Sequence, residues 1–157
     1  MKIVLLAIRK TAKPYLREGI SDYEKRIKAY VTFDYKELPD VKNAQNLSHE
    51  QLKQREGECF FKYIAANDEL ILLDECGKQF CSEDWALYLE KKIIHSTRSL
   101  VFAIGGAYGF SEAMYQKATD VVSLSSMTFS HQMVRLIFTE QLYRAFTIIR
   151  GEPYHHG

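Results

Sequence analysis

Short apolar segments alternate with longer amphipathic segments along the whole chain. This alternation indicates an α/β fold with a mostly parallel sheet, because each helix can carry the chain back between two parallel strands. One segment, residues 99–104, is almost purely apolar, as is typical of a buried central strand. The predicted strands span residues 2–8, 31–38, 69–73, 99–104 and 120–124, and the predicted long helices span residues 14–30, 49–65 and 131–150.

Polar residues mark where several of these helices begin and end. Ser48 and Gln51 have the spacing of a capping box, so a helix is expected to start after Ser48. Two more helices are expected behind Ser82 and Ser111, because serine hydroxyls accept hydrogen bonds from the free amides of a first turn. Gly151 is expected to end the last helix in a left-handed conformation.

The length and the apolar runs indicate one domain, residues 1–157, without a membrane segment. No linker or repeat interrupts the pattern, and no apolar run approaches the roughly 20 residues of a membrane span. The N-terminal apolar run is short, and Arg9 and Lys10 follow it where a signal peptide would carry small residues. We therefore expect a cytoplasmic protein with no membrane partner.

Cysteine spacing and net charge bear on whether the protein binds a metal or a nucleic acid. Cys59, Cys76 and Cys81 match no zinc pattern, so free thiols and no metal are expected. The formal net charge is +1, whereas proteins that hold nucleic acid by charge alone are usually far more basic. Composition alone does not indicate that the protein binds RNA. If it does, its basic residues must be concentrated in one patch of the surface.

Two loops could bind a ligand. Gly105 and Gly106 follow the fourth predicted strand and would let the backbone approach a ligand closely, although a tight structural turn explains them as well. They do not form the dinucleotide fingerprint, which follows the first strand. The loop of residues 124–129 could offer backbone groups to the edge of a purine, or it could be an ordinary serine-rich connection.

The last predicted helix is apolar around most of its circumference. A helix of this kind packs on two sides, here against its own sheet and a second subunit. Its polar side chains are few, and Glu140 and Arg144 have the spacing of a local ion pair. The short tail, residues 154–157, would by itself be expected to fray.

Five motifs stand out when the chain is considered as a whole. They are Leu73-Asp74-x-x-Gly77-Lys78, Ile104-Gly105-Gly106-x-x-Gly109, Met127-Thr128-Phe129-x-His131-Gln132-Met133-x-Arg135, Glu140-Gln141-x-Tyr143-Arg144-Ala145 and Pro153-Tyr154-His155. Each motif alone is weak, but their order and spacing are specific. Together they resemble one family over essentially the whole chain, the small SPOUT-class family called ribosomal RNA large subunit methyltransferase H.

The resemblance implies a SPOUT-type, Rossmann-like sheet with a C-terminal trefoil knot, in a homodimer. It implies transfer of a methyl group from S-adenosyl-L-methionine to N3 of a pseudouridine of 23S rRNA in the assembled ribosome. Carried over by position, the cofactor contacts lie at the carboxyl ends of three strands, where open α/β sheets bind ligands. They are Leu73, Gly105, Leu124, Ser125, Ser126, Met127, Thr128 and Phe129.

The same region supplies candidate catalytic residues. N3 of a uracil-type ring must lose a proton, and His131, His155 and Glu140 are the candidate bases. Arg135 and Arg144 could contact RNA phosphates or stabilise charge on the ring oxygens. An extruded base could stack on Tyr154.

Two positions depart from the family pattern: Ser130 replaces a common proline, and His156 replaces a common basic residue. Two rival functions stay open at this point. A non-catalytic ribosome-binding dimer could retain the fold, and a nicotinamide-dependent oxidoreductase would share the α/β class but lacks its glycine fingerprint.

Overall fold

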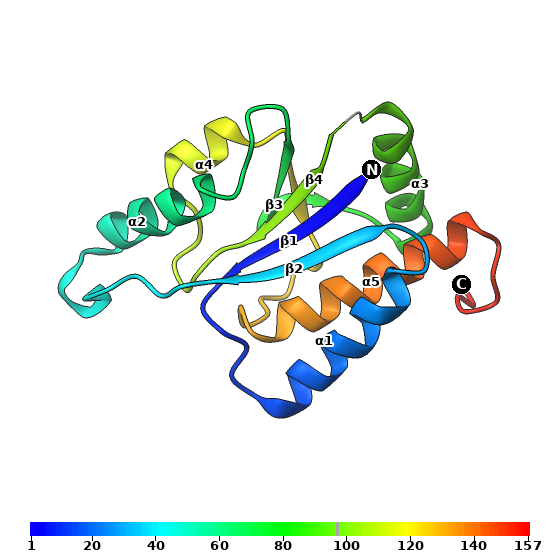
Figure 1. The fold of residues 1–157 in the computed structure, drawn as a ribbon, viewed down its shortest axis with the longest axis horizontal. Coiled ribbons are helices and arrows are strands. Elements are labelled where there is room, and N and C mark those ends of the chain that lie inside the picture. The colour runs from blue at the N-terminus through cyan, green and yellow to red at the C-terminus, as the bar shows by residue number, and fades with distance from the viewer. Residues whose placement is uncertain (97) are drawn as a thin grey trace.

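A single parallel sheet forms the centre of the molecule. The computed structural model describes residues 1–96 and 98–157. All strand pairs are parallel, in the order β2-β1-β4-β3-β5 (Figure 1). The strands are β1 (Lys2–Ile8), β2 (Thr32–Leu38), β3 (Glu69–Gln79), β4 (Leu100–Ile104) and β5 (Asp120–Ser123). The predicted α/β class is confirmed, and all residues of the central strand β4 are buried, as its sequence predicts.

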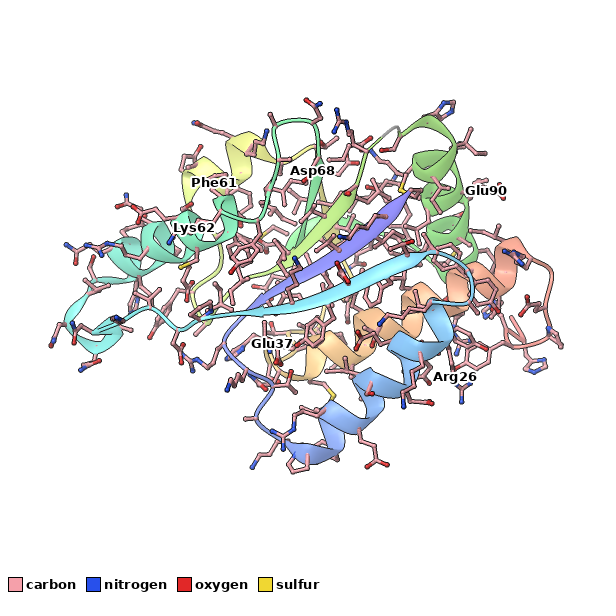
Figure 2. All side chains as sticks on the ribbon, viewed as in Figure 1. Arg26, Glu37, Phe61, Lys62, Asp68 and Glu90 are labelled. Carbon is pink, nitrogen blue, oxygen red and sulfur yellow. The ribbon has the colours of Figure 1, made fainter. Side chains whose placement is uncertain are left out.

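Helices cover both faces of this sheet. On one face lie α1 (Pro14–Ile27), α3 (Ser82–His95) and α5 (Met133–Ile149), with α5 packed against the other two. On the other face lie α2 (His49–Phe61) and α4 (Glu112–Lys117), preceded by the short 3₁₀ helix η1 (Ala44–Asn46). Apolar side chains fill the space between the layers, while charged residues such as Arg26 and Lys62 lie at the surface (Figure 2). No helix within residues 1–96 and 98–157 is long and apolar enough to cross a membrane.

Most predicted helix ends differ by a few residues. The capping box of Ser48 and Gln51 is present, Ser111 caps α4, and Gly151 has a left-handed φ of 67°. The predicted cap at Ser82 is wrong: Cys81 holds that position without a side-chain cap, and the Ser82 hydroxyl donates to Gln141 instead. The first two long helices end earlier than predicted, because main-chain amides beyond them bond to carbonyls three residues back.

The predicted end of the third strand at residue 73 is also wrong. After Leu73 the chain bulges out of register and then pairs with β5 again from Lys78. A Cβ on Gly77 would lie 2.6 Å from the main chain of Val121, so only glycine allows this close return. The bulge brings Asp74 and Glu75 to the carboxyl edge of the sheet. The trefoil knot stays a prediction, since strand order does not show how the loops pass one another.

Candidate active site

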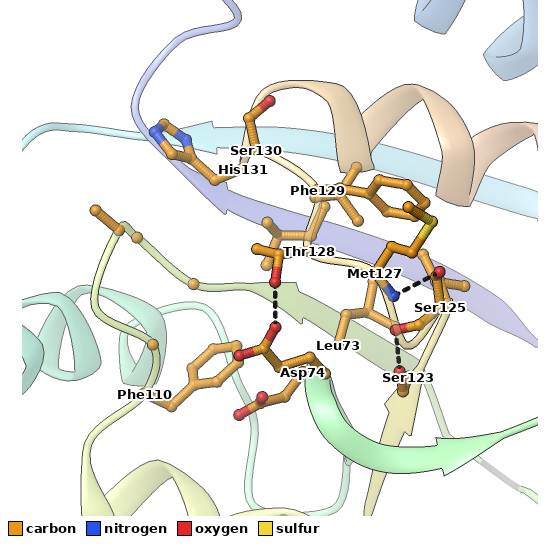
Figure 3. Close-up of a pocket in the computed structure, with 18 residues that line it drawn as sticks. Leu73, Asp74, Phe110, Ser123, Ser125, Met127, Thr128, Phe129, Ser130 and His131 are labelled. Carbon is orange, nitrogen blue, oxygen red and sulfur yellow. Dashed lines mark hydrogen bonds between the residues drawn. The ribbon is translucent and has the colours of Figure 1, made fainter.

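A cavity of about 440 Å³ lies at the carboxyl ends of β3, β4 and β5 (Figure 3). Of the eight predicted cofactor residues, all except Ser126 line it. Ser126 is exposed and lies outside the lining, although it belongs to the same loop. Asp74, Glu75 and Phe110 are among the lining residues that sequence reasoning missed. The two carboxylates were missed because their strand was predicted to end before them.

The glycine turn forms the floor between β4 and α4. The Gly109 amide donates to the Gly106 carbonyl at 3.2 Å, and Gly109 has a φ of 86° that favours glycine. A Cβ on Gly105 would lie 3.3 Å from the Gly109 carbonyl oxygen, so the backbone is already closely packed at this point. A Cβ on Gly106 would lie 2.5 Å from a carboxylate oxygen of Glu56. A side chain at Gly105 would therefore contact the backbone of the turn itself, whereas one at Gly106 would collide with Glu56 of α2.

Short hydrogen bonds shape the opposite wall, the loop of residues 124–130. The Met127 amide donates to the Ser125 hydroxyl at 2.9 Å, and the Thr128 hydroxyl donates to Glu75 at 2.7 Å (Figure 3). The loop ends at Ser130, whose hydroxyl and carbonyl accept hydrogen bonds from the amides of Met133 and Val134. Ser130, one of the two departures from the family pattern, thus caps the turn that leads into α5.

The cavity combines apolar walls with negative charge at its edge. Leu73, Phe110 and Phe129 supply apolar surface, and the carboxylates of Asp74 and Glu75 supply charge. Burial and the hydrogen bond to Asp74 raise the pKa of Tyr115, so its hydroxyl stays protonated and holds that carboxylate in place. Such a pocket suits a ligand with a flat ring and a cationic group.

His131 is the predicted catalytic residue that the structure places in this cavity. Its Nδ1 atom is buried and has no hydrogen-bond partner among the described residues. Burial, with Arg135 and Arg9 nearby, lowers the pKa of His131, so the imidazole is neutral at neutral pH. A neutral ring with a free nitrogen can accept a hydrogen bond from a ligand or donate one to it, depending on its tautomer.

Arg135, in contrast, is fully buried and cannot contact an RNA phosphate in this structure. Its guanidinium donates to the carbonyls of Ile8 and His131 at 2.6 and 2.9 Å. It also donates to the hydroxyls of Thr11 and Tyr35. The expected phosphate contact is therefore corrected: the positive charge lies inside the protein, where these oxygens satisfy it.

The remaining predicted catalytic residues form a separate cluster with the tail, here called the tail cluster: Glu140, Arg144, Tyr154 and His155. The predicted Glu140–Arg144 ion pair is confirmed at 2.6 Å, and Tyr154 donates to Glu140 at 3.0 Å. Arg144 donates to Nδ1 of His155 at 3.0 Å, so Nε2 of that ring carries the proton facing Glu83. These contacts hold a tail that was expected to fray.

The tail cluster does not line the cavity of its own chain. The cavity lies at the start of α5, and the 17 residues of that helix span about 25 Å. The structure thus divides the predicted catalytic residues into His131 at one end and the tail cluster towards the other.

Comparisons with known proteins agree with this geometry. A family model described as a predicted SPOUT methyltransferase matches residues 1–155. The ribosomal RNA large subunit methyltransferase H of Flavobacterium johnsoniae is 55% identical over 99% of each chain, and that of Parabacteroides distasonis is 52% identical over the same share. Among solved structures, a probable methyltransferase from Bordetella pertussis shares the fold alone, with a TM-score of 0.55 and 7% identity over 91% of this chain and 93% of that one.

Proposed function

Because the chain belongs to the SPOUT methyltransferase family and groups with its ribosomal RNA large subunit methyltransferase H members, we propose that it methylates N3 of a pseudouridine in 23S rRNA. The methyl donor is S-adenosyl-L-methionine. The observation that carries this proposal is the cavity at the carboxyl ends of β3, β4 and β5, in a chain that matches these relatives over nearly its full length.

The cavity fits the methyl donor in size and chemistry. Its volume of about 440 Å³ lies within the roughly 300–1,000 Å³ of small-molecule sites. Leu73, Phe110 and Phe129 could cover an adenine ring, and Asp74 and Glu75 could face the donor's cationic groups. When bound, the donor supplies an electrophilic methyl group, and the protein's main task is to align it with the acceptor.

We propose that Gly105 and the loop of residues 124–129 hold the donor through their backbone. Six residues of this set line the cavity, and their amides and carbonyls are the groups that a purine edge can pair with. Ser126 would support the loop without touching the donor, since it lies outside the lining.

A homodimer is part of this proposal. Several α5 side chains, such as Leu136, Ile137 and Glu140, are only half-buried in the single chain, which leaves surface that a second copy could cover. The tail cluster does not line the cavity of its own chain. Packing of two copies through α5 could bring the tail cluster of one protomer to the cavity of the other, where Tyr154 and Arg144 could meet the RNA.

The assembled ribosome is the proposed substrate, and the cytoplasm the proposed location. With a net charge of +1, the chain alone has little charge with which to hold RNA, so a folded ribosomal surface is the better target than free RNA. Residues 1–157 would act as one domain, because both core clusters pack on the same sheet.

Nucleoside mass spectrometry of 23S rRNA tests the activity. Ribosomes from cells lacking this protein should lack N3-methylpseudouridine and gain it after incubation with purified protein and S-adenosyl-L-methionine. Calorimetry should show binding of this donor and not of NADH, which separates the proposal from an oxidoreductase. A protein that binds ribosomes but transfers no labelled methyl group would support the non-catalytic alternative instead.

A further inference from the structure

A second cavity, of about 360 Å³, adjoins the first one. It also lies within the size range of small-molecule sites, whereas a third cavity of about 210 Å³ falls below that range. The two larger cavities share Gly106, Ala107 and His131. Further walls of the second cavity come from Arg9 after β1, Ala44 in η1 and Glu56 in α2. A ligand in it would lie next to the donor, across the glycine turn.

Glu56 brings a buried carboxylate into this second cavity. The residue is 6% exposed, and no salt bridge to it occurs within residues 1–96 and 98–157. Its oxygens lie against Gly106, where a Cβ would come within 2.5 Å. Burial raises the pKa of Glu56 and the nearby Asp40 adds to the rise, while Arg9 and a hydrogen bond from the Gly106 backbone oppose it. A buried carboxylate without an ion-pair partner is costly, which suggests a role in binding or catalysis.

His131 completes the polar lining on the other side. In Figure 3 it lies beside the segment that leaves β1, and Arg9 of that segment lines the same cavity. Its unpartnered Nδ1 means that no third group orients the ring as a general base. We therefore assign His131 to hydrogen bonding of a ligand, which leaves the buried Glu56 carboxylate as the proton acceptor on the opposite wall.

The mouth of the second cavity carries a flat aromatic surface. The rings of His49 and Tyr108 stack with centroids 3.7 Å apart, and both residues line the cavity. Tyr108 is 50% exposed. Unstacked bases commonly stack on such rings when proteins hold single nucleotides.

We propose that the second cavity receives the target pyrimidine ring and that Glu56 accepts the proton from its N3. This inference rests on the proposed function and names the acceptor subsite and base for it. The N3–H bond breaks and its proton passes to the Glu56 carboxylate. The electron pair left on N3 forms the bond to the methyl carbon, and the pair of the broken carbon–sulfur bond stays on sulfur. His131 hydrogen-bonds a neighbouring ring oxygen or N–H.

Glu56→Gln tests the base, with Glu58→Gln as a matched control on the exposed side of the same helix. We expect E56Q to bind S-adenosyl-L-methionine in calorimetry as the wild type does. Its kcat on unmethylated ribosomes at neutral pH should fall by about 10²–10⁴-fold, the usual contribution of a general base. The deficit should shrink as pH rises, because N3 then loses its proton to solvent. E58Q should match the wild type.

Ala44→Trp is an independent test, because Ala44 lines the second cavity and not the first. This variant should bind the donor normally and lose methyl transfer, since the indole fills the space for the pyrimidine ring. If E56Q does not fold, A44W still tests whether the second cavity receives that ring.

Two results would overturn the inference while leaving the proposed function intact. One is wild-type turnover in either E56Q or A44W. The other is loss of donor affinity in E56Q, which would mean that the carboxylate only supports the glycine turn. If the wild-type protein itself methylates no ribosomes, the proposed function fails, and this inference fails with it.

Discussion

The guanidinium of Arg135 donates a 2.7 Å hydrogen bond to the main-chain carbonyl of Arg9, which lies 126 positions earlier in the chain. Arg9 has a φ of 74°, a conformation that non-glycine residues rarely adopt. The contact joins the start of α5 to the end of β1, where both cavities meet. Arg135 therefore holds the walls of the site from inside the protein.

Replacing Arg135 with Met should destabilise the protein by about 3–5 kcal/mol, the usual cost of removing one partner from a buried charged network. The carbonyls of Ile8 and Arg9 would lose a donor, and water could not replace it. Urea denaturation measures the change. Arg26→Met, at an exposed site on α1, is the control and should change stability little. Equal stability of R135M and wild type would contradict this role.

Gly105→Val should abolish binding of S-adenosyl-L-methionine and leave the proposed dimer intact. A Cβ at this position already lies 3.3 Å from the Gly109 carbonyl, and the two methyl groups of valine would extend into the cavity. Calorimetry measures the affinity, and gel filtration measures the dimer. Ser126→Ala is the matched control, because Ser126 does not line the cavity. Normal affinity in G105V would refute the placement of the donor.

Deleting residues 154–157 should spare donor binding and remove methyl transfer to ribosomes. The deletion takes away Tyr154 and His155 from the tail cluster, which does not line the proposed donor cavity of the same chain. Calorimetry and transfer of a labelled methyl group give the two readouts. Tyr154→Phe is a milder companion that keeps the ring and loses only the hydroxyl contacts with Glu140 and Tyr23. If methyl transfer persists after the deletion, the tail has no role in the reaction.

The raised pKa of Glu56 should appear in the pH dependence of stability. The unfolded carboxyl loses its proton near its ordinary pKa of about 4.3, while the folded one keeps it to higher pH. Between these two values the folded state binds more protons, so the contribution of Glu56 to stability falls as pH rises. The melting temperature of E56Q minus that of the wild type should therefore increase as pH rises through this window. At higher pH this difference should stay constant. A constant difference from pH 4 upward would show that this pKa is not raised.

Several features of this protein follow from local sequence patterns. Apolar runs predict all five strands, and apart from the extension of β3 their ends differ from the structure by at most a few residues. Ser48 and Gln51 predict a capping box that is present. These predictions succeed because the contacts behind them lie within one strand or one helical turn. The glycine turn after β4 is of the same kind, since its conformation depends on glycine at Gly109.

Other features depend on contacts between distant segments, which periodicity does not record. The sequence alone determined the α/β class, the order of its elements and the two loops that line the larger cavity. Only the tertiary structure buried Arg135 under the end of β1, returned β3 to β5 past Gly77 and set Glu56 of α2 against Gly106. The physical reason is that a side chain's exposure and charge environment depend on which remote backbone groups pack around it, and that packing exists only after the layers have assembled.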